Sequence, residues 1–367
     1  MKRRMALLAG TALAIASLTA CGGSKPAETA APATTAAPAA TEAASEAKTE
    51  APETEAAETF ETAKVRLAYM PNMGSASLAV TARDKGFFEE MGLDVSMVEF
   101  QGGPAEIAAM ASGDIDISQI GHGAHALCAE GEAVIFQIDA TSLADAVIGN
   151  TDKGVGSIEE LKGKTVAVTS GTSAEIILNM ALQSVGMTQD DIEAVEMDAN
   201  GIVSAMVSGN VDACATWSPG TATIMDALGD KAIMLANNND YVEQVTFPSS
   251  FITSQKYADA NHDILVRFSR ALQKAADYRS ANIDEVAKLV AKQCEVDESI
   301  MLACTGEGNW GLTGEFVGKG LADGTIKNYY ENQQKVFIDG GRLTEEVPVD
   351  NYVLFDVMQE AYDANNK

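Results

Sequence analysis

A short segment of the chain occurs twice, and this repeat constrains the fold more than any other feature. Residues 109–117 read AMASGDIDI and residues 205–213 read AMVSGNVDA, with five of nine positions identical. Upstream of each copy, a β-branched run (VRLAY at 65–69, VAVT at 166–169) leads into a small polar turn and a helical pattern. The order strand, turn, helix, strand, helix, strand therefore occurs twice. This order predicts two similar α/β lobes with parallel sheets and helices on both faces.

Glycine positions and apolar periodicity predict where helices lie and end. The first helix of each unit is expected to end at Gly92 and Gly186, because glycine is favoured just beyond a helix C-terminus. Residues 262–281 place their apolar side chains on one face of a helix. Three later segments also look helical, namely 284–293, 325–338 and 350–364.

The chain is predicted to pass between the lobes twice. VTFPSSFITS at 245–254 looks extended and should lead back to the first lobe. Crossings near 147–156 and 245–252 would form a hinge, which makes the first lobe discontinuous in sequence. The expected boundaries are 64–147 for the start of the first lobe, 148–248 for the second lobe, and 249–367 for the helices that complete the first.

The first 63 residues predict export and anchoring. A basic start and an apolar run too short to span a bilayer predict a signal peptide over residues 1–20. The sequence Leu-Thr-Ala-Cys-Gly around Cys21 resembles the lipobox of bacterial lipoproteins, a family in which this cysteine is diacylated. Cys21 is therefore expected to hold the protein on the membrane, the alternative being a plain signal peptide. Residues 21–63 are mostly Ala, Thr, Pro and Glu, which predicts a disordered tether.

Charge and cysteine content exclude several classes of function. The chain carries 25 basic and 53 acidic residues, which argues against binding to nucleic acid or lying flat on anionic lipid. No C-x-x-C pair or metal-spaced histidine occurs, so we expect no metal and no cofactor. Cys128 and Cys214 lie in apolar patterns and should be core thiols. Cys294 and Cys304 could form a disulfide or remain two free thiols, and the sequence leaves both open.

Candidate binding residues follow from the predicted sheets. In open α/β sheets, ligands bind outside the carboxyl ends of the strands, where loops and helix N-termini converge. Four such corners occur, and all four would line one cleft if the lobes face each other. The candidate ligand-binding residues at these corners, with one acid near the first crossing, are Tyr69, Asn72, Met73, Gly121, His122, Ser170, Gly171, Thr172, Ser173, Trp217 and Asp145.

Several of these residues also have a purely structural interpretation. Thr172 and Glu175 fit a capping box, although backbone N–H groups of that first helical turn would remain available to an anion. A carboxylate at Glu175 would compete with such an anion, which favours a neutral or amine-bearing ligand. Trp217 and Met73 could be packing residues. Asp145 could meet an amine or simply cap the hinge.

The body resembles a known family as an ordered set of segments. These are VRLAYMPNMGSASLAVTARDKGFFEEMGLDVSMVEF, AMASGDIDISQIGHG, SIEELKGKTVAVTSGTSAEIILNMAL and AMVSGNVDACATWSP, covering roughly 64–280. They are similar to the periplasmic substrate-binding proteins of ATP-binding-cassette importers, in the nitrate, sulfonate and taurine group that includes thiamine-precursor-binding homologues. The resemblance implies a two-lobed type II periplasmic-binding-protein fold that closes on a small solute and docks on a permease. It also implies ligand contact at residues 170–173. The chain departs from the family pattern at two positions. Glu175 stands where the family often has His or another uncharged residue, and Ser218 stands where the family has an acid between Trp and Pro.

The sequence thus predicts a monomeric, lipid-anchored solute receptor on the extracytoplasmic face of a Gram-positive cell membrane. Its partners would be a small solute and the permease and ATPase of an ABC importer. The alternative is a non-transport lipoprotein of the same fold, acting as a sensor partner or adhesion module. Enzyme activity is not expected, because the Ser170–Ser173 turn lacks both G-x-S-x-G and the lysine of a phosphate loop. A related fold serves as a pyrimidine synthase in thiamine biosynthesis, but that activity does not suit an exported lipoprotein.

Overall fold

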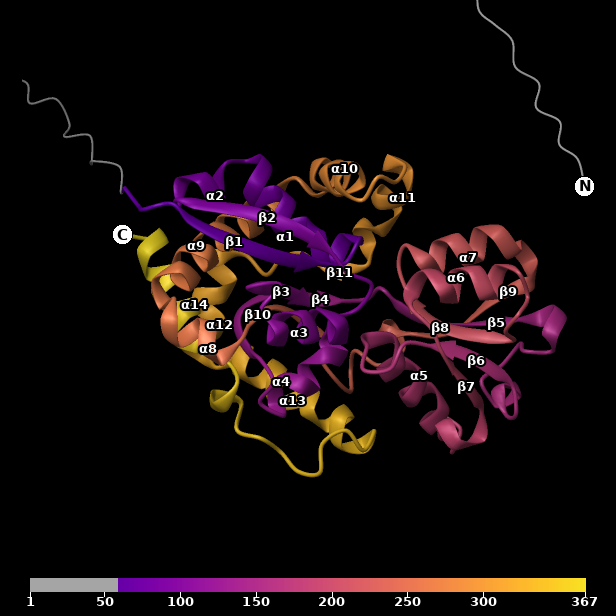
Figure 1. Ribbon diagram of the computed structural model, residues 1–367. Helices are drawn as coiled ribbons and strands as arrows, with labels where there is room; N and C mark the ends of the chain where they lie inside the picture. The colour runs from indigo at the N-terminus through magenta and orange to yellow at the C-terminus, as the bar shows by residue number, and fades with distance from the viewer. Residues whose placement is uncertain (1–58) are drawn as a thin grey trace, which may run out of the picture. The chain divides into compact units, whose positions relative to one another are not determined.

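The computed structural model describes residues 59–367 and contains two β-sheets in that range (Figure 1). The predicted signal peptide, Cys21 and the tether as far as residue 58 lie outside the described residues. The first sheet has the strand order β11-β4-β10-β3-β1-β2 and the second has the order β7-β6-β8-β5-β9. We call each sheet, with the helices packed on it, a lobe. Among the described residues, no helix is both long and apolar enough to cross a membrane.

The strands of the first sheet come from three separate parts of the chain. They are β1 (Ala63–Tyr69), β2 (Leu93–Glu99), β3 (Ile117–Ile120), β4 (Val134–Ser142), β10 (Pro248–Thr253) and β11 (Gly308–Asn309). The strands of the second sheet are consecutive in sequence. They are β5 (Asp145–Asn150), β6 (Thr165–Val168), β7 (Glu193–Glu196), β8 (Ala213–Trp217) and β9 (Ala232–Asn237).

Helices cover both faces of each sheet. Those of the first lobe are α1 (Met73–Asp84), α2 (Phe87–Glu90), α3 (Gly103–Ser112), α4 (His125–Ala129), α8 (Gln255–Ala260), α9 (His262–Ala281), α10 (Ile283–Gln293), α11 (Glu298–Ala303), α12 (Gly314–Asp323), α13 (Thr325–Asp339) and α14 (Phe355–Asn365). Those of the second lobe are α5 (Ser173–Ser184), α6 (Ala199–Val207) and α7 (Gly220–Leu228).

Alternating side chains divide the core of each lobe into two layers. In the first lobe, Leu67 of β1 packs with residues of α1 and α9, whereas its neighbour Ala68 packs with residues of α3 and α13. In the second lobe, Val147 of β5 packs with α5 and the adjacent Ile148 packs with α6 and α7. Successive residues of a strand point to opposite faces, so each buried strand supplies both layers.

The repeated segment has the same structural task in both lobes. Its aspartate follows a helix that ends in a glycine with positive φ, 82° in the first copy and 71° in the second. In the first lobe, Asp116 Oδ2 accepts a hydrogen bond from the backbone N–H of Arg66 on β1, at 2.8 Å. In the second lobe, Asp212 Oδ2 accepts from the backbone N–H of Thr165 on β6, at 3.0 Å. The aspartate thus ties the incoming strand to its neighbour in each lobe.

The sheets are mixed: the predicted parallel pairs are present, but antiparallel pairs occur beside them. β1 runs parallel to β2 and β3, and β6 runs parallel to β7 and β8. However, β10 is antiparallel to β3 and β4, and β5 is antiparallel to β8 and β9. The short strand β11 is also antiparallel to β4. Of these antiparallel strands, β5 and β10 are the ones that enter a sheet from the other lobe. A strand that comes from the opposite lobe starts at the edge of the sheet that faces that lobe, where the parallel strands end, and it therefore runs antiparallel to them.

Three predicted boundaries also need correction. The first crossing lies at residues 143–144, because β5 already belongs to the second sheet and the predicted hinge at 147–156 follows its start. The first helix stops at Asp84, since Gly86 adopts a left-handed φ of 79° and separates α1 from α2. The folded body begins before residue 64, because Ala63 starts β1 and the Phe60 ring lies 5.2 Å from the Arg267 guanidinium carbon.

Candidate functional site

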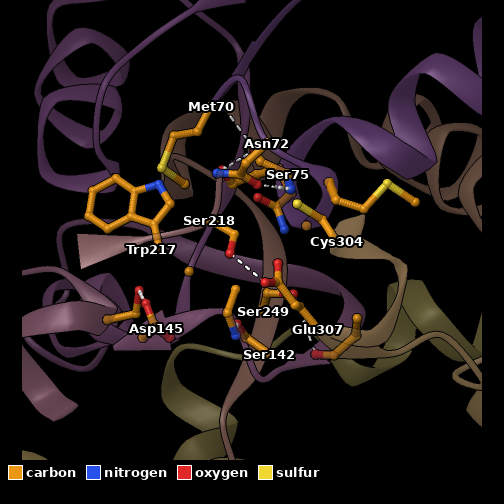
Figure 2. Close-up of a pocket in the computed structure, with 18 of the residues that line it drawn as sticks. Met70, Asn72, Ser75, Ser142, Asp145, Trp217, Ser218, Ser249, Cys304 and Glu307 are labelled. Carbon is orange, nitrogen blue, oxygen red and sulfur yellow. Dashed lines mark hydrogen bonds between the residues drawn. The ribbon is translucent and has the colours of Figure 1, made fainter. Parts of the chain in front are cut away.

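One pocket is lined by residues from all four predicted corners (Figure 2). Asn72 follows β1, Gly121 follows β3, Thr172 follows β6, and Ser218 follows β8. Two corners come from each lobe, so the pocket lies between the lobes. The site lies at the strand ends because unpaired backbone polar groups and helix N-termini are available to a ligand there.

The structure brings most of the predicted binding residues to this pocket. Those among its lining are Asn72, Met73, Gly121, Asp145, Thr172, Ser173 and Trp217. Four others lie outside the lining. Tyr69 is buried and its hydroxyl accepts a hydrogen bond from Gln293 Nε2 at 2.8 Å. His122 is fully buried behind the pocket, Ser170 is exposed and bonded to a glutamate, and Gly171 packs near Pro104.

The turn before α5 differs from the predicted capping box. Thr172 is the N-cap residue, but its hydroxyl donates to the carbonyl oxygen of Thr169 at 2.7 Å. Glu175 reaches one residue further back, and its Oε2 accepts from the backbone N–H of Gly171 at 2.7 Å. The same carboxylate forms an ion pair with Arg342 at 3.1 Å and does not line the pocket. The expectation that Glu175 disfavours an anion therefore loses its basis, because its charge is compensated away from the pocket.

Asp145 is the most heavily bonded acid of the pocket. Ser173 donates to its Oδ1, and Asn238 Nδ2 donates to its Oδ2 at 3.1 Å. His122 Nε2, from the first lobe, lies 3.1 Å from the same Oδ2. These bonds join β5 to α5, to the segment after β9 and to the segment after β3 of the first lobe, so Asp145 ties the two lobes together. Its oxygens are largely committed to the protein.

Glu307 is a second acid of the pocket, and sequence reasoning missed it. Ser218 Oγ, from the second lobe, donates to Glu307 Oε1 at 2.6 Å, and Figure 2 shows the two side chains pointing toward one another. Burial is the main cause that raises the pKa of Glu307, and the charge of Asp145 raises it further. In residues 59–367, no lysine, arginine or histidine forms an ion pair with this carboxylate.

Further lining residues come from segments that have no strand-end signature. Trp310 and Cys304 lie beside Glu307 in the C-terminal part of the chain, and Gln119 lies within β3. Met70, Gly74, Ser75 and Ser218 also line the pocket and belong to the predicted corners, although they were not among the candidate binding residues. The lining residues that sequence reasoning missed are Gly103, Gln119, Ala124, Ala140, Thr141, Ser142, Ala144, Ser249, Cys304, Glu307 and Trp310. The prediction that the C-terminal helices complete the first lobe was the one signal that pointed to residues 304–310.

A series of hydrogen bonds behind Gln119 fixes the orientation of its side-chain amide. Its Nε2 donates to Asp139 Oδ2 at 2.7 Å, and Asp139 Oδ1 is 2.7 Å from Nη1 of Arg279. A carboxylate only accepts hydrogen bonds from an amide, so the NH₂ group of Gln119 must face Asp139. Gln119 Oε1 is then a buried acceptor, and it has no partner within the described part of the chain.

The two lobes touch closely at Gly123. A Cβ atom added there would lie 2.1 Å from the carbonyl carbon of Thr172 and 2.4 Å from the backbone nitrogen of Ser173. Both distances are far below van der Waals contact, and both atoms belong to backbone. Glycine is therefore required at position 123 for the lobes to approach as they do here.

The cysteines in the described residues form no disulfide. Cys128 and Cys214 are fully buried, which confirms their assignment to the core, and Cys294 and Cys304 are both free. Burial raises the pKa of the Cys304 thiol to about 12, so this pocket residue is protonated at neutral pH. Among residues 59–367, no cluster of three His, Cys, Asp or Glu side chains could hold a metal ion.

Comparison with known proteins identifies relatives for this architecture. The family model described as "NMT1/THI5 like" matches residues 75–286. A protein of Brucella abortus (strain 2308) described as a binding protein is 32% identical over 292 residues, covering 80% of this chain and 90% of the relative. The taurine-binding periplasmic protein of Escherichia coli (strain K12) is 24% identical over 227 residues, covering 60% of this chain and 68% of the relative.

Solved structures agree with the fold. The alkanesulfonate-binding protein SsuA from Xanthomonas axonopodis pv. citri, bound to MOPS, superposes with a TM-score of 0.64 at 20% identity. The match covers 80% of this chain and 99% of that one. The predicted two-lobed α/β fold of the periplasmic binding proteins is therefore confirmed.

Proposed function

Because the chain belongs to the NMT1/THI5-like family, we propose that it is a membrane-anchored extracytoplasmic receptor for a small solute. In this proposal the solute is held between the two lobes and delivered to the permease of an ABC importer. Cys21 would provide the anchor, as the lipobox-like sequence suggests. The relatives described as binding proteins support the role of a solute-binding protein.

The observation that carries the proposal is the interlobe pocket. Its lining combines corners from both sheets, and direct contacts between the lobes, such as Ser218 with Glu307, surround it. A site shared by two lobes links ligand binding to their closure, because the ligand bonds to both only when they are together. Closure gives a permease a surface by which it can distinguish the loaded receptor from the empty one.

The same geometry argues against a hydrolytic serine. Ser173 donates to the carboxylate of Asp145, and His122 also bonds to that carboxylate instead of to the serine. A nucleophilic serine needs a base that accepts its proton, and a carboxylate shared with two other donors is a poor one. The Ser173, Asp145 and His122 cluster is better explained as a tie between the lobes.

A thermal-shift screen of the purified full chain tests the receptor proposal. The candidate solutes are sulfonates, nitrate, pyrimidines, amino acids and amines. A solute at about 100 times its Kd should stabilise the protein by roughly 2.7 kcal/mol. Trp217→Ala should weaken that binding at least tenfold, with the variant still folded by circular dichroism. Trp217→Phe, which keeps an apolar ring, should retain most of the affinity. The receptor proposal fails if no solute shifts the melting temperature.

Closure itself is tested at Gly123. Gly123→Ala should lower solute affinity by a factor of ten or more, because the methyl group meets the Thr172 backbone and holds the lobes apart. Gly102→Ala is a matched control, since its Cβ would only reach ordinary contact with the Thr172 side chain, at 3.9 Å. Calorimetric titration with the solute found in the screen gives both affinities. Equal affinities for the two variants would show that binding does not need this approach of the lobes.

A further inference from the structure

The charges around the pocket are of one sign. Asp145 and Glu307 are among its lining residues, and no lysine or arginine is. The buried cation Arg279 lies behind Trp310, with its guanidinium carbon 4.9 Å from the ring centroid. Its charge is already balanced by Asp139, because Nη1 and Nη2 both bond to that residue. A ligand anion would therefore find no free cationic side chain here.

The acceptors of the pocket are not all satisfied by the protein. Gln119 Oε1 is buried and has no partner among residues 59–367, and its orientation is fixed by Asp139. Glu307 has Ser218 as a hydrogen-bond donor but has no cationic partner in the same range. Unpaired buried acceptors are costly, so a ligand that supplies N–H donors would gain from meeting them.

Some backbone N–H groups in the turns that lead into α1 and α5 are already bonded within the protein. At α1, the backbone N–H of Ser75 donates to Asn72 Oδ1 at 2.8 Å, and that of Met70 donates to Ser75 Oγ at 2.9 Å. In the turn before α5, the N–H of Gly171, one residue ahead of the N-cap Thr172, is taken by Glu175. These local bonds remove donors from the corners that an anion would use.

Two tryptophans add surfaces that suit a cation. Trp217 lines the pocket from the second lobe and Trp310 lines it from the first. The indole N–H of Trp310 donates to the carbonyl of Thr305 at 2.6 Å, so it is not available to a ligand. The π-face of tryptophan is the most favourable of the aromatic side chains for a cation.

We propose that the solute of this pocket is a small organic cation with N–H groups, such as a protonated amine or amidine, and that Glu307 selects it. This inference rests on the proposed receptor function and adds the charge of the solute. Glu307 provides the carboxylate for the charged nitrogen, Gln119 Oε1 accepts a further N–H, and a tryptophan ring covers the cation. Asp145 contributes to the negative potential but remains bonded to the protein.

Matched amines and anions test the inference on the purified full chain. The probes are propylamine, benzylamine and 4-aminopyridine, each compared with an anion of similar size: propanesulfonate, benzenesulfonate and isonicotinate. Calorimetric titration should show at least one amine binding tenfold or more tightly than its anion. Glu307→Gln keeps an acceptor for Ser218, and it should remove that preference. Glu315→Gln, an exposed acid on α12, should not.

The pH dependence of amine affinity tests the role of Glu307 independently. An amine needs the ionised form of Glu307, so amine affinity should fall as pH drops through the raised pKa of that carboxyl. The Glu307→Gln variant should show no such loss. The cation proposal is overturned if anions bind as tightly as amines, if no amine binds, or if Glu307→Gln leaves amine affinity unchanged. Anion or zwitterion binding would leave the receptor function standing, whereas the lack of any bound solute would remove both.

Discussion

Replacing Arg279 by methionine should lower the free energy of unfolding by about 3–5 kcal/mol. Arg279 on α9 and Asp139 on β4 are both fully buried, with Nη1 and Oδ1 2.7 Å apart. Nη1 also donates to Ser77 Oγ on α1 at 2.7 Å, so one guanidinium joins α9, α1 and the sheet. Burial raises the pKa of Asp139, and Arg279 opposes that rise. Without the arginine, Asp139 must be buried either as an unpaired charge or as a protonated acid.

Chemical denaturation of three variants separates this cause from a simple packing loss. Arg66→Met removes an exposed ion pair, with Asp116 2.6 Å away, and should cost less than about 1 kcal/mol. The double variant Arg279→Met with Asp139→Asn removes the unpaired charge and keeps an acceptor for Gln119. It should recover a large part of the loss. If it is no more stable than Arg279→Met alone, the lost stability comes from packing rather than from charge.

Glu106→Gln should gain stability over the wild-type protein as pH rises, by roughly 3–5 kcal/mol between pH 5 and pH 9. Glu106 on α3 is fully buried, and its Oε2 accepts from Ser118 Oγ on β3. Its Oε1 has no partner among the described residues. Burial raises the pKa of this carboxyl from 4.5 to about 8.

The sign of this pH dependence of stability follows from the number of protons bound in the native and unfolded states. Between pH 4.5 and pH 8 the native state holds a proton on Glu106 that the unfolded state has lost, so wild-type stability falls as pH rises through this window. Glutamine has no proton to lose and escapes this fall. Urea unfolding of both proteins at pH 5, 7 and 9 gives the difference directly. Glu89→Gln, an exposed acid on α2, should change by less than about 0.5 kcal/mol at each pH. A pH-independent difference for Glu106→Gln would contradict the prediction.

Much of the fold could be predicted because it depends on local patterns. The long apolar periodicity of 262–281 corresponds to α9 with the same bounds, and 325–338 corresponds to α13 to within one residue. The repeat predicted two similar units, and Asp116 and Asp212 make the same bond in each. Strand direction could not be predicted in the same way. β5 and β10 are antiparallel because of where the chain enters each sheet, which depends on contacts between distant segments.

The residues of the candidate site also fall into those that local sequence predicted and those that only tertiary contacts bring to the pocket. Residues at strand ends, such as Asn72 and Trp217, were predicted because the end of a strand is visible in sequence. His122 was expected in the cleft because of its two flanking glycines, yet it is fully buried beneath Asp145. Glu307 lies far along the chain, between the segments 284–293 and 325–338 that were predicted as helical, and no binding role was predicted there. Only the packing of the C-terminal segments against the first lobe brings it to the pocket.

The sequence by itself determined the fold class of the body, through a duplicated α/β unit, and it located four strand ends where a ligand could bind. Those features depend on periodicity, glycine positions and residue order, all of which act over short distances along the chain. The tertiary structure decided the charge of the pocket. Glu175 is turned away and paired with Arg342, Glu307 is brought in, and Arg279 is neutralised behind Trp310. Electrostatic character depends on which charges lie within a few ångströms of each other, and that is set only when distant segments pack together.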